Sequence, residues 1–181
     1  MFSKNKIKLT ILYPILHYPP VIGGLEQWSQ NIAERQPYNI EIIVVTGRVK
    51  GEPNFEKKND VTIVRTSLFG LQDLSYSSWF YILAAVPFII FRSFIISQQR
   101  KVDLFHCHGF VSAVMGCLLS AMSGKPFLCT EQSIKLRNPI SKLLARIVYK
   151  KSGCMRCLKS CRRRRVSKNR HRKNRGYPKR R

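Results

Sequence analysis

Acidic residues are scarce in this sequence. The chain has 9 Asp and Glu against 33 Lys and Arg, which gives a formal net charge of +24 over 181 residues. All nine acids lie in residues 1–149, whereas residues 150–181 hold 16 Lys and Arg and no acid. The net charge of the whole chain is therefore the sum of two unlike parts, a mildly basic domain and a tail without negative charge. It does not describe the folded part.

The sequence also lacks a clean transmembrane run. Residues 79–96 are apolar except for Arg92 and Ser93, but Pro87 interrupts them, and a span needs about 20 uninterrupted apolar residues. We expect a core helix or a membrane-surface helix there. The apolar run near the N-terminus is broken by Pro14 and His17 and has no small-residue cleavage site, so we expect no secretory signal.

Cysteines occur singly in the apolar part of the chain. Cys107, Cys117 and Cys129 each lie within a hydrophobic segment. This placement predicts buried, reduced thiols in a cytoplasmic protein.

The sequence alternates β-branched runs with helical patterns. Residues 6–14 and 39–47 are typical of strands buried on both faces of a parallel sheet, and an amphipathic helix at 25–34 lies between them. Further strands are predicted at 61–67, 102–109 and 126–133, further helices at 76–98, 110–124 and 140–151, and a polar turn region at 50–60. This order predicts an α/β fold, a Rossmann-like parallel sheet with helices on both faces.

Two segments at strand ends carry polar groups or glycines. Gly23 and Gly24 follow the first strand, where the backbone can approach a ligand and the next helix can direct N–H groups at a phosphate. His106 and His108 end a later strand on one face, so they could ligate a metal, but no third ligand is near. The alternative for the histidines is one packed and one exposed imidazole, and for the glycines a plain loop.

Residues 130–133 end the next strand. Glu131 and Gln132 could project toward the same edge as His108, whereas Ser133 could simply cap the following helix.

Three motifs appear in order along the chain: P-P-x-x-G-G-x-E from residue 19, D-x-x-H-x-H-G from residue 103, and G-K-P-x-x-x-T-E-x-S from residue 124. Together they resemble the N-terminal domain of the retaining glycosyltransferases of family 4, and the similarity covers most of residues 7–149. The resemblance implies a GT-B architecture, in which two Rossmann-like domains face each other across a cleft.

The resemblance also implies an activity. A sugar would pass, with retention and without a metal or other cofactor, from a nucleotide-diphospho-sugar to a lipid-linked, polysaccharide or small acceptor. Gly23, Gly24 and Glu26 would lie on the donor-phosphate and acceptor side of the cleft, with His108 and Glu131 facing it.

The chain departs from the family in two respects. Gln132 stands where the family commonly has a histidine near the reacting centre, and we take it as the candidate catalytic residue. Glutamine can hydrogen-bond a hydroxyl but cannot take a proton as imidazole does. In addition, 181 residues leave no room for the nucleotide-binding C-terminal domain, so we expect this acceptor-side half to be inactive alone.

The basic tail admits two ordinary interpretations. Cys154, Cys157 and Cys161 supply three thiolates that His171 could complete to a zinc site. The arginines at 162–165 could bind nucleic acid or another anionic surface by charge, which is the alternative function. The tail has no interleaved aromatic residues, so we expect no specific nucleic-acid partner.

A third interpretation is a shift of reading frame near Lys151. Codons that encode residues 152–161 can be read one base later as A-D-A-C-V-A-S-K-A, close to the family text K-A-D-A-V-I-A-V-S-K-A. Codons for residues 176–181 can likewise give V-I-P-N-G, the family's next hallmark. We therefore divide the chain into a glycosyltransferase-like domain at 1–151 and an out-of-frame, unstructured tail at 152–181.

This interpretation sets the expected partners and location. Besides sugar donor and acceptor, a separately encoded C-terminal half would be a partner. The mildly basic domain and the apolar segment 79–96 suit a cytoplasmic protein that docks on an anionic membrane surface.

Overall fold

The computed structural model describes residues 9–37, 39–58, 60–66 and 79–130, together with Arg146 and Val148. The strands are β1 (Leu9–Pro14), β2 (Ile40–Gly47), β3 (Phe55–Lys58), β4 (Val61–Thr66), β5 (Leu104–His108) and β6 (Phe127–Thr130). The helices are α1 (Gly24–Glu34), α2 (Trp79–Gln99) and α3 (Gly109–Ser123).

The six strands form one sheet in the order β3-β4-β2-β1-β5-β6. Neighbours run parallel except for β3, which pairs antiparallel with β4 at one edge. The chain builds outward from β1 through β2 to β4, and then returns to add β5 and β6 on the other side of β1. The strand order therefore reverses between β1 and β5, the place where open α/β sheets bind ligands beyond the carboxyl ends of the strands.

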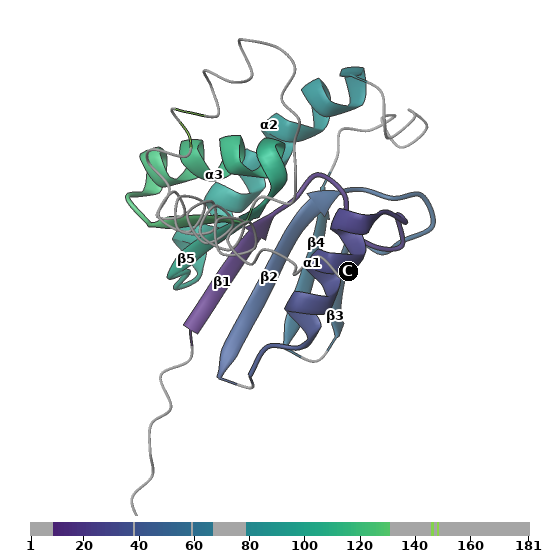
Figure 1. Cartoon of the computed structure of the whole chain (residues 1–181), viewed down its shortest axis with the longest axis horizontal. Coiled ribbons are helices and arrows are strands. Elements are labelled where there is room, and N and C mark those ends of the chain that lie inside the picture. The colour runs from purple at the N-terminus through teal and green to yellow at the C-terminus, as the bar shows by residue number, and fades with distance from the viewer. Residues whose placement is uncertain are drawn as a thin grey trace, which may run out of the picture.

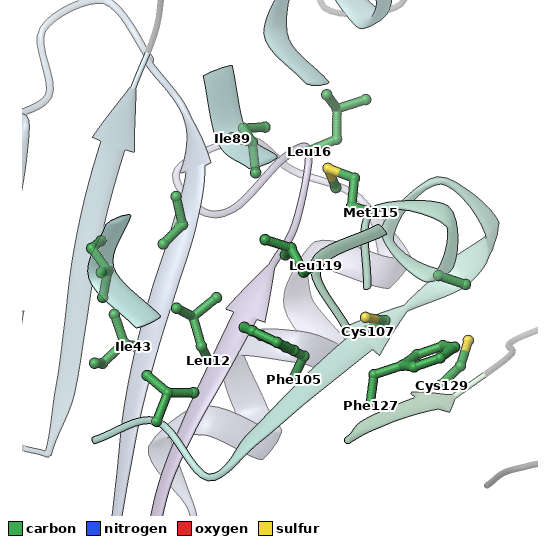
Figure 2. Close-up of a cluster of buried hydrophobic side chains, with 14 of the residues drawn as sticks. Leu12, Leu16, Ile43, Ile89, Phe105, Cys107, Met115, Leu119, Phe127 and Cys129 are labelled. Carbon is green, nitrogen blue, oxygen red and sulfur yellow. The ribbon is translucent and has the colours of Figure 1, made fainter. Parts of the chain in front are cut away.

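Helices cover both faces of the sheet, with α1 on one face and α2 and α3 on the other (Figure 1). The larger core cluster lies under α2 and α3. Figure 2 shows its side chains from β1, β2, β5, β6 and both helices, among them Leu12, Ile43, Ile89, Phe105, Met115 and Phe127. The smaller cluster packs Ala33 of α1 against Tyr13 and Val44. The predicted Rossmann-like α/β fold is thus confirmed, although β3 makes the sheet mixed.

Alternation along β5 assigns its side chains to the two cores. Phe105 and Cys107 belong to the cluster under α2 and α3, whereas Leu104 packs with the cluster on the α1 face. Cys107 pairs in register with Cys129 of β6, and both thiols are buried as predicted, while Cys117 is half-buried. Burial raises the pKa of the Cys107 thiol, with a further contribution from Cys129.

The region predicted as a polar turn, residues 50–60, contains β3, so that prediction was wrong in part. The strand reads Phe-Glu-Lys-Lys and is mostly exposed. An edge strand needs no apolar alternation, because it gains its order from backbone pairing with its one neighbour, here β4. Composition alone therefore carried no signal for it.

α2 is a single helix that continues through Pro87. Pro87 is exposed, so the ring projects away from the sheet. By length and composition this helix could cross a bilayer. In this fold, however, one of its faces packs on the sheet through Tyr81, Ala85 and Ile89, as a core helix does.

The last predicted helix, 140–151, lies mostly outside the described residues. Arg146 and Val148 are helical, and Val148 is buried in the cluster under α2 and α3. The tail at 152–181 lies wholly outside the described residues.

Two glycines determine where α3 ends and how closely it packs on the sheet. Gly124 closes the helix in the left-handed region at φ 71°, and its N–H donates to the Ser120 carbonyl at 2.9 Å. Gly116 faces β5 and β6 so closely that a Cβ there would overlap Cys107 Sγ and lie 3.2 Å from Phe127. A glycine at position 116 therefore sets the distance between α3 and the sheet.

We predict that Gly116→Ala lowers the free energy of unfolding by about 2 kcal/mol, because overpacking outweighs the better helix propensity of alanine. Gly24→Ala is the matched control, since a Cβ at Gly24 meets nothing within 4 Å. The control should change stability by less than about 0.5 kcal/mol in denaturant unfolding. Equal stability of the two variants would refute this account of the α3 packing.

Candidate functional site

The two candidate segments meet at one edge of the sheet. β1 and β5 are parallel neighbours, with Leu12 in register with Phe105, so their carboxyl ends lie side by side. β1 ends at Pro14 and leads into the glycine loop, residues 19–24, whereas β5 ends at His108. The loop and the histidines are thus placed at the switch point of the sheet.

His106 is held by the sheet itself. Its Nε2 lies 2.7 Å from the hydroxyl of Thr130 in β6, and its ring stands edge-on to Tyr13 with 5.0 Å between ring centroids. Burial lowers the pKa of His106 to about 4. The expected exposed imidazole is instead half-buried and hydrogen-bonded, because β6 continues the sheet beside it.

His108 is fully buried and differently placed. Its ring centroid lies 4.7 Å from that of Tyr13 and 5.1 Å from that of Trp28 in α1. Burial, and then the neighbouring His106, lowers the pKa of His108 to about 3, so the ring is neutral near pH 7. Within the described residues neither ring nitrogen has a hydrogen-bond partner, an arrangement that costs about 1–3 kcal/mol.

The two glycines of the loop have different surroundings. A Cβ at Gly23 would overlap the Glu26 carboxylate, which folds back over it from the first turn of α1. Gly24 has nothing within 4 Å of its Cβ position and does not adopt positive φ. Among the described residues, neither packing nor backbone conformation requires a glycine at 24.

Two helices begin beside each other at this edge. The first turn of α1 packs on the junction of β5 and α3, since Leu25 lies 3.4 Å from the Cβ position of Gly109 and Trp28 contacts His108. The N-cap residues Gly23 and His108 make no side-chain capping hydrogen bond. Among the described residues no capping side chain closes either helix, and the positive ends of both helix dipoles lie at this edge, where they favour an anion.

α2 reaches the same edge from the other face of the sheet. The Tyr81 ring stacks on His17 with 5.5 Å between centroids and 13° between planes. The Tyr81 hydroxyl lies against Gly47, which ends β2, so closely that a Cβ on residue 47 would overlap the hydroxyl oxygen. The N-terminal end of α2 is thus fixed at the edge that carries the candidate site.

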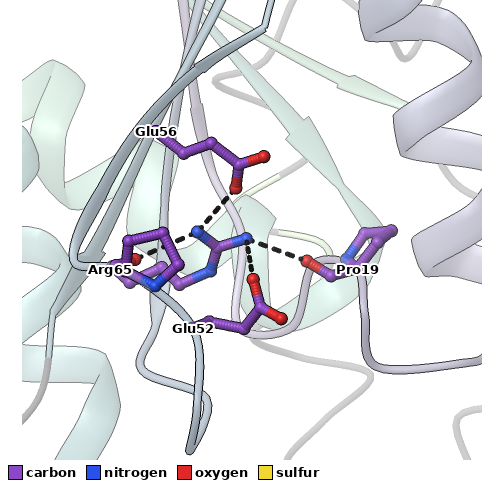
Figure 3. A network of polar contacts seen from close by, with 5 residues as sticks. Pro19, Glu52, Glu56 and Arg65 are labelled. Carbon is purple, nitrogen blue, oxygen red and sulfur yellow. Dashed lines mark hydrogen bonds and ion pairs between the residues drawn. The ribbon is translucent and has the colours of Figure 1, made fainter.

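Arg65, which was not among the residues predicted from sequence, holds the start of the glycine loop by a hydrogen bond to Pro19. Its guanidinium pairs with Glu56 at 2.9 Å and with Glu52 at 3.6 Å, and it donates to the carbonyl of Pro19 at 3.3 Å (Figure 3). The side chain is almost fully buried. A lone arginine inside the buried run 61–66 was the available signal, because a buried charge needs partners.

The remaining predicted site residues cannot be placed. Glu131, Gln132 and Ser133 lie outside the described residues, as do the cysteines and His171 of the tail. Among residues 9–37, 39–58, 60–66 and 79–130, no three His, Cys, Asp or Glu side chains gather as a metal site would require.

The buried histidines predict a pH dependence of stability. The pKa values of both histidines are lower in the folded chain than in the unfolded chain. Below about pH 6.5 the unfolded chain therefore binds protons that the folded chain does not, and the free energy of unfolding decreases as the pH is lowered. Between about pH 7 and pH 5, His108→Gln should lose about 2 kcal/mol less than the wild type. Parallel pH curves from denaturant unfolding would contradict this.

Removing the Arg65 guanidinium should be costly. Arg65→Met leaves its carboxylate and carbonyl partners without a donor, so we expect a loss of about 3 kcal/mol in the free energy of unfolding. Lys58→Met is the control, because Lys58 pairs with Glu34 at 3.0 Å on the exposed surface. It should change stability by less than about 1 kcal/mol, and a similar loss in both variants would refute the role of burial.

No protein-family model matches the chain, and no curated protein matches its sequence. Solved structures do match: sucrose-phosphate synthase from Thermosynechococcus elongatus superposes with a TM-score of 0.58 at 14% identity, over 80% of this chain and 41% of that one. A second structure of sucrose-phosphate synthase from this organism superposes with a TM-score of 0.53 at 13% identity. The match covers 75% of this chain and 67% of that one. The chain spans about two fifths of the first structure, and the likeness identifies its fold as glycosyltransferase-like.

Proposed function

We propose that this chain is the N-terminal, acceptor-side domain of a retaining glycosyltransferase of family 4. The enzyme would use a nucleotide-diphospho-sugar and a lipid-linked, polysaccharide or small acceptor. The glycosyltransferase-like fold supports the class of activity, and the three motifs described above support the family.

One arrangement carries the proposal. The N-termini of α1 and α3, which have no capping side chain, lie beside each other at the switch point. The buried ring of His108 contacts Trp28 of α1 and has no hydrogen-bond partner among the described residues. A helix N-terminus alone is a common feature. Two of them with an unsatisfied buried imidazole form a site suited to a phosphate and a hydroxyl together.

The site residues divide the work by chemistry. The N–H groups at Gly24 and Gly109 would hold donor phosphate oxygens, and Glu26 would accept hydrogen bonds from sugar hydroxyls. His108 is neutral and without a partner among the described residues, and because both ring nitrogens are buried, it would donate to or accept from a ligand atom only after the side chains that cover it move. Glu131 and Gln132 would contact the donor sugar, with Gln132 orienting it rather than moving a proton.

The second half of such an enzyme would be encoded downstream. We propose that the residues after Lys151 are read out of frame, or else that a separate chain supplies the nucleotide-binding domain. The nucleotide sequence distinguishes these: a second domain in the shifted frame supports the first, and one in a neighbouring gene supports the second. If the basic tail itself carried the function, as in the alternative of binding to nucleic acid or another anionic surface, we would expect a second domain neither in the shifted frame nor in a neighbouring gene.

Inorganic pyrophosphate tests the anion site on the chain as it exists. We predict that titration shifts the backbone amide resonances of Gly24–Gln27 and Gly109–Val111 together, at a single midpoint. Gly24→Val should weaken this response at least about tenfold, because the side chain would occupy the space the anion needs.

His106→Gln is the matched control for this titration, because His106 already bonds Thr130 and should not affect the response. Resonances of the basic tail will also shift with pyrophosphate, so only the amides of α1 and α3 count. Shifts confined to the tail, or unchanged affinity in Gly24→Val, would refute the proposed site.

A further inference from the structure

The outward face of α2 is as apolar as its buried face. Phe80, Leu83 and Phe91 are 76%, 69% and 63% exposed, and with Pro87 they follow the helical spacing of one stripe. The opposite stripe packs on the sheet. A helix of a soluble domain normally presents polar residues outward, so this stripe is a surface feature without a structural cause.

The neighbouring helix α3 extends this apolar surface. Leu118 and Met122 are 46% and 55% exposed, one turn apart. α2 and α3 cover the same face of the sheet, so their outward sides belong to one side of the molecule (Figure 1). We call these five side chains the α2/α3 face: Phe80, Leu83, Phe91, Leu118 and Met122.

The charges on α2 and α3 themselves are basic. Neither helix contains Asp or Glu, and Arg92 and Lys101 lie on or next to α2. Two further cations have partners within the fold: Arg100 pairs with Glu41 at 3.7 Å, and Lys125 donates to the carbonyls of Ser97 and Val102. The one acid in residues 79–130 is Asp103, whose carboxylate accepts from the Thr10 N–H at 2.9 Å within the sheet. An apolar face with basic neighbours matches the interface of an anionic bilayer, where apolar side chains enter and cations meet lipid phosphates.

We infer that the α2/α3 face docks on an anionic lipid membrane, with Phe80, Leu83 and Phe91 inserted at the headgroup boundary. Self-association through this face is disfavoured, because each copy carries 33 Lys and Arg against 9 Asp and Glu and two copies would repel. The inference does not depend on the transferase activity, since it concerns a different surface.

Vesicle binding by the full chain tests the inference. Phe80→Ser, Leu83→Ser and Phe91→Ser together should weaken binding to phosphatidylcholine–phosphatidylglycerol vesicles at least about tenfold. Phe55→Ser is the control, because Phe55 is 57% exposed on β3 and lies outside the face. Circular dichroism of the variants confirms that they fold.

A second measurement separates insertion from attraction by the basic tail. The chain already contains Trp28 and Trp79, so the signal is the fluorescence that each variant adds to the wild type. The fluorescence added by Phe91→Trp should be quenched by brominated acyl chains in the same vesicles, and that added by Phe55→Trp should not. Equal vesicle affinity of the triple variant and the control, or no quenching of Phe91→Trp, would overturn the inference. It would also be overturned if the triple variant turned a dimer into a monomer in sedimentation velocity while vesicle binding stayed unchanged.

Discussion

The pairing of β1 with β5 is the constraint on which the rest of the structure depends. It is the step at which the chain, having built one side of the sheet, returns to begin the other. Reciprocal hydrogen bonds fix its start: the Asp103 N–H donates to the Thr10 carbonyl at 2.9 Å, and the Thr10 N–H donates to the Asp103 carboxylate at 2.9 Å. This register brings the loop after β1 and the histidines at the end of β5 to one edge.

This topology produces the two surfaces to which we assign separate proposed tasks. The carboxyl edge collects two helix N-termini without a capping side chain and an imidazole without a described partner, and an anionic substrate could satisfy these polar groups. The α2/α3 face exposes apolar side chains that a bilayer can cover. Tyr81 fixes the start of α2 at the carboxyl edge, so a docked domain would hold its site near the membrane, where a lipid-linked acceptor resides.

Much of the fold was predictable because buried strands and helices carry apolar patterns. β2, α1 and the end of α3 at Gly124 followed the predictions closely. β3 did not, since an edge strand is ordered by backbone pairing. Within the site, the glycines and histidines could be found from sequence, but the contact of Trp28 with His108 and the partners of Arg65 are tertiary and leave only weak local signals.

The central claim is that the carboxyl edge is half of a sugar-transfer site. The most direct measurement restores the shifted reading frame after Lys151, expresses the resulting protein, and follows sugar transfer from nucleotide-diphospho-sugars by NMR. The account predicts transfer with retained anomeric configuration by the restored protein and none by the 181-residue chain. Transfer by the short chain alone, or a restored protein with a complete second domain but no sugar transfer, would contradict it.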